Sequence, residues 1–334
     1  MFNNKSILIT GGTGFFGNYF VKYLYKYYKP KRIVVFSRDE AKQFDMKSYF
    51  SKPKYKGLKF FIGDVRDKER LILALENIDF VIHAAALKQV PASEYNPMEC
   101  IKTNIHGAEN VISAALQCNV KKIIALSTDK AANPINIYGA TKLASDKLFV
   151  AANNLVGKKN IRFSVVRYGN VFASRGSVVP YFKSLIKKGR INLPITNVNM
   201  TRFVITIEQG IDFVIKSFQR MQGGEIFIPK IPSIKIVDLA KAMSPKSKFS
   251  MVGVRPGEKI NEILCPSDDY HLTYEYKDHF VIAPSIKFYQ VNYNYNRNKL
   301  KEKGKLVKFG FEYQSGTNKE FLTISQIKKL LQKI

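Results

Sequence analysis

The chain is poor in several residue types, and each shortage excludes a class of protein. It has 3 cysteines, 4 histidines and no tryptophan. Cys100, Cys118 and Cys265 are scattered and odd in number, so they predict neither a disulfide framework nor a CxxC pair. The histidines show no ligand spacing, and we therefore expect no metal site. No stretch approaches the roughly 18 unbroken apolar residues of a membrane span.

The remaining composition is that of an ordinary globular protein. Hydrophobic residues make up 46% and charged residues 24% of the 334 residues, which excludes a disordered or collagen-like chain. The N-terminal segment runs directly into an apolar strand pattern, so we expect no signal peptide. Together with the scattered cysteines, this predicts a protein of the reducing cytoplasm with no membrane partner.

Acidic residues are also scarce, because 26 Asp and Glu stand against 54 Lys and Arg, which gives a formal net charge of +28. A charge of that size attracts polyanions in general. The lysines are spread along the whole chain, without a single basic block or an aromatic RNA-binding motif. The pattern favours a diffuse, solvated lysine surface and no nucleic-acid partner. A basic nucleic-acid-binding protein is the remote alternative.

Six short apolar runs alternate with helical patterns in the first half of the chain. Their apolar residues are consecutive, as in parallel strands that are covered on both faces. The sequence therefore predicts an α/β fold of the Rossmann type, with a doubly wound parallel sheet and right-handed crossovers. The predicted strands are 5–10, 31–37, 59–65, 79–85, 121–127 and 162–168, and the predicted helices are 14–28, 39–50, 67–76, 97–118 and 136–156.

A glycine-rich turn ends the first predicted strand and opens the first predicted helix. Its glycines allow a tight turn, a close approach of the backbone to a pyrophosphate, and close packing of helix on strand. The N-terminus of the helix then faces the phosphates. This position at the start of six β-α units predicts a dinucleotide site formed by Gly11, Thr13, Gly14, Phe15, Phe16 and Gly17.

The end of the second predicted strand indicates which dinucleotide is bound. An acidic residue there normally binds the ribose hydroxyls of NAD. Here the strand ends in Ser37-Arg38-Asp39, and a guanidinium after a hydroxyl suits the 2′-phosphate of NADP. We therefore expect NADP, with NAD as the less favoured cofactor because of Asp39. The remaining predicted cofactor residues are Lys42, Asp64, Val65, Ala84, Ala85, Ala86 and Val171, together with Tyr138 and Lys142.

The pattern loosens after about residue 172 into short helices, loops and a few extended pieces, with no linker. We interpret residues 1–171 as a Rossmann domain that binds NADP and carries the catalytic residues. Residues 172–334 are interpreted as mainly a smaller, interleaved substrate-binding domain, with some segments returning to the sheet.

Tyr138 and Lys142 form a candidate catalytic pair on the fifth predicted helix. Their spacing of i and i+4 places both on one helix face, where an ammonium can stabilise a phenolate. A tyrosine with a lowered pKa is a general base for a sugar hydroxyl. Thr128, at the end of the preceding predicted strand, supplies a further hydrogen bond to the same oxygen.

With these motifs, the chain resembles the extended short-chain dehydrogenase/reductases. More narrowly, it is similar to the inverting UDP-N-acetylglucosamine 4,6-dehydratases of the polysaccharide biosynthesis family, which begin pseudaminic acid synthesis. The matching blocks include HAAALKQVPASEYNPMECIKTNI, ALSTDKAANPINIYGATKLASDKLF, VVRYGNVFASRGSVVP and RPGEK, and the resemblance covers about residues 5–330. It implies UDP-N-acetylglucosamine as substrate, a tightly bound and recycled NADP, and a homo-oligomer.

The resemblance also implies roles for the residues that follow Thr128. Asp129 is expected to be the general acid for the C6 hydroxyl and Lys130 the base that takes the C5 proton. Lys130 must then be partly neutral, which we expect from burial and the neighbouring cofactor charge. The residues expected to bind substrate are Lys88, Asn170, Val179, Arg202 and Arg255, with Thr128 and Tyr138.

Two other activities on the same scaffold stay open. One is a UDP-sugar C4 epimerase, and the other is a 4,6-dehydratase that retains the C5 configuration. The Asp129-Lys130 pair argues against the epimerase, which needs no acid and base for C6 and C5. The retaining enzymes carry Asp-Glu at this point. Departures from the family pattern at Phe15-Phe16, Gln89 and Phe172-Ala173 touch the cofactor and sugar pockets and leave the substrate preference open.

Overall fold

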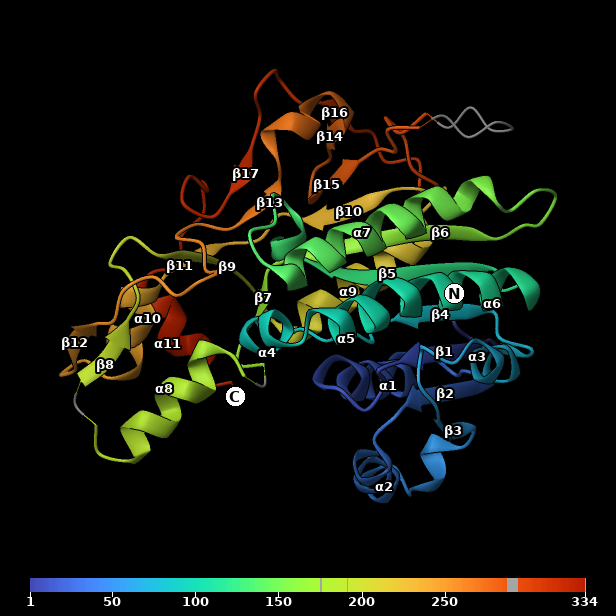
Figure 1. Cartoon of the computed structure of the whole chain (residues 1–334), viewed down its shortest axis with the longest axis horizontal. Helices are drawn as coiled ribbons and strands as arrows, with labels where there is room; N and C mark the ends of the chain where they lie inside the picture. Colours follow the sequence, from blue (N-terminus) through green and yellow to red (C-terminus); the bar gives the residue numbers. More distant parts are fainter. Residues whose placement is uncertain (175, 191, 287–293, 334) are drawn as a thin grey trace.

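The computed structural model describes residues 1–174, 176–190, 192–286 and 294–333 (Figure 1). Within these residues the largest sheet has ten strands, in the order β16-β14-β15-β10-β6-β5-β4-β1-β2-β3. They are β1 (Ser6–Thr10), β2 (Arg32–Ser37), β3 (Leu58–Ile62), β4 (Phe80–His83), β5 (Lys122–Thr128), β6 (Arg162–Tyr168), β10 (Ile226–Pro229), β14 (Thr273–Glu275), β15 (His279–Ile282) and β16 (Lys305–Leu306).

The strands from β3 across to β10 run parallel, and β15, β14 and β16 extend the sheet in antiparallel fashion. Every residue of β1 and β4 is buried, which explains their continuous apolar sequence. The predicted α/β fold with a doubly wound sheet is therefore confirmed. The chain leaves β1 toward β3 and returns on the other side at β4, so a ligand crevice is expected outside the carboxyl ends of these two strands.

Helices cover the sheet in two groups. Helix α1 packs beside α9, whereas α3, α6 and α7 pack side by side. In Figure 1, α7 lies in front of the sheet and α9 behind it. The bounds are α1 (Phe15–Tyr27), α2 (Glu40–Tyr49), α3 (Lys68–Leu75), α4 (Val90–Tyr95), α5 (Pro97–Ile101), α6 (Gly107–Gln117), α7 (Ile137–Ala151) and α9 (Ile207–Arg220), with short 3-10 turns at Pro53–Tyr55, Asp129–Ala131, Ala152–Asn154 and Ser267–Leu272.

The single helix predicted over 97–118 is interrupted. A π-helical turn, Lys102–His106, separates α5 from α6. This turn presents Asn104, whose Oδ1 accepts from the Leu87 N–H at 2.8 Å and whose Nδ2 donates to the Leu87 carbonyl at 2.9 Å. The extra residue in the π-helical turn therefore lets Asn104 fix the loop after β4. The helical periodicity of the sequence did not indicate this contact, because it joins distant segments.

A smaller lobe lies beyond the carboxyl ends of the parallel strands and has its own apolar clusters (Figure 1). It contains a three-stranded sheet, a two-stranded sheet and three helices, as far as the described residues show. The elements are β7 (Asn170–Val171), β9 (Thr201–Ile205) and β11 (Ser233–Lys235), then β8 (Asn192–Ile195) and β12 (Lys248–Met251), with α8 (Val178–Lys187), α10 (Ile236–Met243) and α11 (Ile324–Leu331); β13 (Ile263–Cys265) pairs with β17 (Tyr313–Gln314) beside it.

Helix α9 belongs to the large sheet, although it follows residue 172 and was not among the predicted helices. Thr206 and Gln209 form a capping box at its N-terminus, and its apolar face is buried. That capping box was the sequence signal for this helix. Among the described residues, no helix combines the length and the apolar character needed to span a bilayer.

Candidate active site

The glycine turn after β1 lies against the loop after β4. A Cβ on Gly11 would stand 2.9 Å from the Ala85 Cα, and Gly11 has a φ of +64°, so no side chain fits there. A Cβ on Gly17 would stand 2.2 Å from the Gly12 carbonyl oxygen, which brings α1 close to the turn. Gly14 caps α1 without a side-chain hydrogen bond. The bare N-terminus of α1 and this backbone cradle suit the phosphates of a dinucleotide.

Thr10, at the end of β1, and His83, at the end of β4, hold the same turn in place. The Thr10 Oγ1 accepts from the Ala84 and Ala85 N–H groups, each at 3.2 Å, and lies 2.8 Å from the His83 Nδ1. Burial, assisted by the charge of Lys142, lowers the pKa of His83 to about 3, so the imidazole is neutral. Because the Thr10 Oγ1 already accepts from two N–H groups, its hydroxyl is left to donate a hydrogen bond to the neutral Nδ1. Neither residue was predicted, because a buried threonine and histidine in strands give no sequence signal.

The side chains predicted to select the cofactor gather at the ends of β2 and β3. The Arg38 Nη1 lies 3.4 Å from the Asp64 Oδ2, and the Arg38 side chain is 50% exposed. Asp39 caps α2 and is also bonded by the Lys42 ammonium. Hydrogen bonds from Lys42 hold the pKa of Asp39 below its usual range. The Ser37 Oγ accepts from Gln43, which ties it to α2. The carboxylate of Asp39 is therefore already hydrogen-bonded within the protein and is not open to a ribose hydroxyl.

Three consecutive candidates, Thr128, Asp129 and Lys130, lie where β5 ends and a short 3-10 turn begins. The Thr128 Oγ1 donates to the Asp129 Oδ1 at 2.9 Å, and the Lys130 Nζ donates to the same oxygen at 2.8 Å. The Asp129 side chain is 1% exposed. Its other oxygen, Oδ2, has no hydrogen-bond partner among the described residues. A buried carboxylate with a free oxygen beside an ammonium is equipped for proton transfer.

A second carboxylate, Glu262, contacts Lys130 from a distant part of the chain. Its Oε1 lies 3.3 Å from the Lys130 Nζ and 3.6 Å from the Arg202 Nε. Burial by itself lowers the pKa of Lys130, but Asp129 and Glu262 outweigh it and raise that pKa above its usual range. Burial alone therefore does not make Lys130 partly neutral, because two carboxylates flank the ammonium, and the expected effect of the cofactor charge stays a prediction.

Tyr138 and Lys142 lie on α7, which Asn136 caps. Both side chains are buried. Burial raises the pKa of Tyr138 to about 12, although the Lys130 charge and a hydrogen bond with Thr128 act to lower it. Burial also lowers the pKa of Lys142. The lowered tyrosine pKa expected from the helix pair is therefore wrong for this structure, since desolvation of the phenolate exceeds the effect of the nearby cations.

The predicted substrate residues differ in how the structure places them. Partial desolvation and then the Lys130 charge lower the pKa of Lys88, although its side chain is exposed. Arg202 is buried and donates to the Ile260 carbonyl at 3.1 Å. Asn170 is half-buried in β7. The Val179 side chain is 2% exposed in an apolar cluster, so it packs, and its substrate contact stays a prediction.

The segment around Arg255 is held against the catalytic turn by two further contacts. The Lys259 Nζ donates to the Ala132 carbonyl at 2.7 Å, and the Asn136 Nδ2 donates to the Gly257 carbonyl at 2.8 Å. The Arg255 side chain is 65% exposed and its Nε lies 3.6 Å from the Glu258 Oε2. Lys259 and Glu258, to which the sequence assigned no role, are therefore part of the wall of the site.

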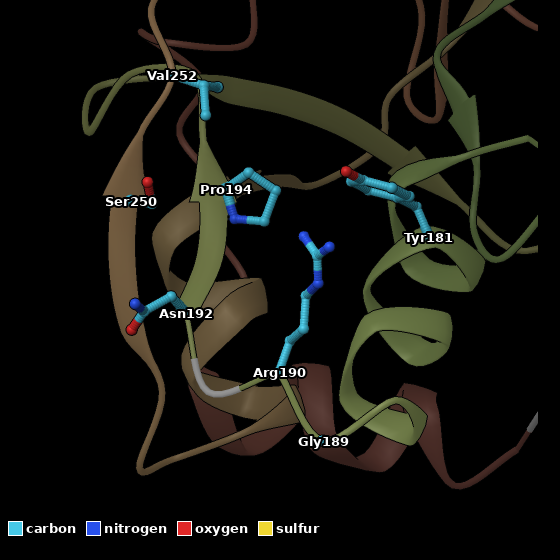
Figure 2. A pocket seen from close by; sticks show the side chains of 7 residues that line it. All are labelled: Tyr181, Gly189, Arg190, Asn192, Pro194, Ser250 and Val252. Atoms are coloured by element: carbon cyan, nitrogen blue, oxygen red, sulfur yellow. The ribbon is translucent and has the colours of Figure 1, made fainter.

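A separate cavity of about 610 Å³ lies in the smaller lobe, between α8, β8 and β12. Figure 2 shows the Arg190 side chain extending between Tyr181 on α8 and Pro194 on β8. None of its lining residues, Tyr181, Gly189, Arg190, Asn192, Pro194, Ser250 and Val252, is a predicted catalytic residue.

Comparison with known proteins shows which family the chain belongs to. Residues 7–284 match the model of a family described as "Polysaccharide biosynthesis protein". The chain belongs to this family. A Campylobacter jejuni serotype O:2 protein named UDP-N-acetylglucosamine 4,6-dehydratase (inverting) is 61% identical over 95% of this chain and 94% of its own length. A second C. jejuni protein of the same name, from serotype O:23/36, is 58% identical over 98% of this chain and 97% of its own length.

Other relatives of the chain carry a different name. A UDP-glucose 4-epimerase of Rickettsia akari is 46% identical over 80% of this chain and 80% of its own. Among solved structures, Pen from Bacillus thuringiensis is 36% identical, with a TM-score of 0.88 over 100% of this chain and 98% of its own. The dTDP-glucose 4,6-dehydratase DesIV from Streptomyces venezuelae is 21% identical, with a TM-score of 0.67 over 76% of this chain and 86% of its own, which shows a shared fold.

Proposed function

We propose that this chain is a UDP-N-acetylglucosamine 4,6-dehydratase that inverts C5. The product is UDP-2-acetamido-2,6-dideoxy-β-L-arabino-hex-4-ulose, a first intermediate for pseudaminic acid or another surface glycan. The observation that carries the proposal is the contact of the Lys130 ammonium with Asp129, at 2.8 Å, at the end of β5 beside the buried Tyr138. The two C. jejuni dehydratases, at 61% and 58% identity, support the same substrate and outcome.

A dinucleotide cofactor is part of the proposal, because the glycine cradle and the open N-terminus of α1 fit its pyrophosphate. When bound, the dinucleotide would supply the hydride acceptor for oxidation at C4 of the sugar and the hydride donor for reduction at C6. We propose NADP, tightly held and recycled. The Arg38 side chain is half exposed and its ion pair with Asp64 is long, at 3.4 Å, so it can turn to a 2′-phosphate, whereas the Asp39 carboxylate is bonded by Lys42 and caps α2.

Tyr138 takes the proton from the C4 hydroxyl as C4 is oxidised. Its pKa of about 12 means that the phenol is protonated before substrate binds, so it must first release that proton to solvent, and the Lys130 charge favours the resulting phenolate. Thr128, which also hydrogen-bonds Tyr138, holds the phenol oxygen in place. Lys142 is buried on the same helix, one turn after Tyr138, and burial lowers its pKa.

Loss of water then requires an acid for the C6 hydroxyl and a base for C5. The resting pair is an Asp129 carboxylate and a Lys130 ammonium that share a hydrogen bond of 2.8 Å. Passage of one proton along this bond gives a neutral amine and a neutral carboxylic acid, with no change in net charge. Lys130 then takes the C5 proton, which the new C4 ketone acidifies, and Asp129 protonates the leaving C6 hydroxyl.

A C4 epimerase is the second candidate, because the R. akari relative with that name is 46% identical. Epimerisation needs Tyr138 but gives Asp129 and Lys130 no proton to move. The buried, unpartnered Asp129 Oδ2 therefore favours the dehydratase among the residues described.

The proposal extends to a homo-oligomer in the cytoplasm, without a nucleic-acid partner. Cys100, Cys118 and Cys265 are free thiols, as a reducing compartment allows. The two-part organisation, a cofactor domain over 1–171 and a substrate lobe over 172–334, is also a proposal. In it, β10, β14, β15 and β16 are the described strands of the second part that join the large sheet, and α9 packs on that sheet.

Proton NMR of the purified protein with UDP-N-acetylglucosamine in deuterated water tests this function. We expect a 4-keto-6-deoxy product with deuterium at C5 and the L-arabino configuration. Lys130→Ala should lower the rate by about 10²–10⁴-fold, the usual contribution of a general base. Lys121→Ala, which removes an exposed lysine just before β5, should leave it unchanged. Conversion to the C4 epimer alone, or retention of the D-xylo configuration, would overturn the proposal.

A further inference from the structure

Glu262 is a buried acid to which neither the sequence nor the proposed reaction assigns a role. Its side chain is 2% exposed, and its Oε1 contacts Lys130 at 3.3 Å. Its Oε2 is buried and has no hydrogen-bond partner within the described part of the chain. A charged carboxylate is costly to bury unless it is paired. The contact with Lys130 therefore explains why Glu262 can be buried at this place.

The backbone around Glu262 is fixed independently of Lys130. The Glu262 N–H donates to the Ser315 Oγ at 2.9 Å, and the Ser315 N–H donates to the Glu262 carbonyl at 2.8 Å. The Ser315 hydroxyl lies 2.7 Å from the Thr201 Oγ1. Strand β13 begins directly after Glu262 and pairs with β17. These bonds hold the carboxylate at a fixed place opposite the catalytic turn.

We propose that Glu262 is a positioning residue that holds the Lys130 amine beside Asp129 and stabilises the ammonium formed when that amine takes the C5 proton. This inference rests on the proposed dehydratase reaction. A carbon-bound proton is a weak acid even beside a ketone, so the rate gains from a stronger base. A fixed negative charge near the amine supplies that strength without reorganisation.

The other charged groups around Lys130 act in both directions. Asp129 and Glu262 favour its ammonium, and Arg202 opposes it. The Lys130 charge acts to lower the pKa of Lys88, of Lys259 and of Tyr138. Arg202 also contacts Glu262, at 3.6 Å, so it competes with Lys130 for the same oxygen. Among the described residues, the acids that pair with Lys130 are Asp129, in the catalytic turn, and Glu262. Glu262 is thus the paired acid that comes from outside that turn and from outside α7.

The matched pair of variants is Glu262→Gln and Glu275→Gln. Glu275 is an exposed acid whose ion pair is with Lys230, at 2.8 Å. The readout is the pKa of Lys130 in the substrate-free protein, measured by competitive acetylation across pH and mass spectrometry of the peptide that contains it. Glu262→Gln should lower this pKa by about 1–3 units, the usual effect of losing an opposite charge at this distance. Glu275→Gln should leave it unchanged.

The second readout is kinetic. With substrate deuterated at C5, Glu262→Gln should show a larger isotope effect on turnover and a rate up to about tenfold lower for each pKa unit that the amine loses. Glu262→Asp keeps the charge one methylene farther away and should lower the Lys130 pKa by less. It also serves as the test should the Gln variant not fold.

Equal Lys130 pKa values in the wild type and both Glu262 variants would overturn the inference. Failure of the proposed function looks different, because the wild type would then form no 4-keto-6-deoxy product while the acetylation measurement would still report the Lys130 pKa. A lowered Lys130 pKa with an unchanged C5 isotope effect would overturn the kinetic role of Glu262.

Discussion

The buried ion pair between Arg167 and Asp146 ties the catalytic helix to the sheet, and its loss should be among the more destabilising single changes. The Arg167 Nη2 lies 3.1 Å from the Asp146 Oδ2, with side chains 2% and 0% exposed. The same Oδ2 accepts from the Ser127 hydroxyl at 2.7 Å. Asp146 belongs to α7, and Arg167 and Ser127 to β6 and β5. We therefore predict the effect of Asp146→Asn.

The magnitude follows from what the substitution leaves behind. The amide keeps the shape of the side chain, but the Arg167 guanidinium stays buried without a counter-charge, with only the Leu264 carbonyl as a recorded acceptor, at 3.2 Å. Removing one partner of a buried pair costs about 3–5 kcal/mol. Against a total stability of about 5–15 kcal/mol, that loss is large. Pairing Asp146→Asn with Arg167→Met removes both charges and should recover much of it.

Urea unfolding followed by far-UV circular dichroism measures this, because the chain has no tryptophan to report on unfolding. The control is Glu275→Gln, which removes an exposed ion pair with Lys230 and should cost about 0–1 kcal/mol. The reasoning is refuted if Asp146→Asn costs no more than this surface control, or if the double variant is less stable than Asp146→Asn alone.

Two further predictions concern the cofactor. Gly17→Ala should lower the amount of dinucleotide bound per purified chain, because its Cβ would stand 2.2 Å from the Gly12 carbonyl oxygen; Gly210→Ala in α9, where the nearest atom is 4.0 Å away, should keep it at the wild-type level. Arg38→Ala should reduce the preference for NADP over NAD by at least about tenfold, the scale of one charge-assisted hydrogen bond of 1.5–3 kcal/mol. Competition between the two nucleotides for the stripped protein measures it, and an unchanged ratio would contradict the NADP assignment.

The elements of the parallel sheet were predictable because their signals are local. The six predicted strands correspond to β1 through β6 with ends shifted by a few residues, since fully buried parallel strands are continuous apolar runs. The glycine turn and the Thr128 to Lys130 segment were also found from adjacent residues. The catalytic turn follows a strand end, where parallel sheets place their ligands.

The missed features depend on contacts between distant segments. Glu262 reaches Lys130 only because β13 pairs with β17 and Ser315 fixes the backbone beside it. No spacing in the sequence relates Glu262 to the catalytic turn. The pKa of Lys130 could not be predicted from burial alone, and the expected pKa direction of Tyr138 was wrong, for the same reason, since both depend on how deeply each group is buried and on which charges the fold brings to it.

The charge on Lys130 gives the proposed reaction an order. While Lys130 is an ammonium, it lowers the pKa of Tyr138 and so favours the phenolate that takes the C4 hydroxyl proton. Once Tyr138 is protonated, that benefit is no longer needed, and transfer of the Lys130 proton to Asp129 creates the acid and the base for the second step. Because Glu262 favours the ammonium, it delays this transfer and strengthens the amine afterwards. Glu262→Gln should therefore weaken the first step through Tyr138, and in the second step it should ease the transfer to Asp129 while leaving Lys130 a weaker base for the C5 proton.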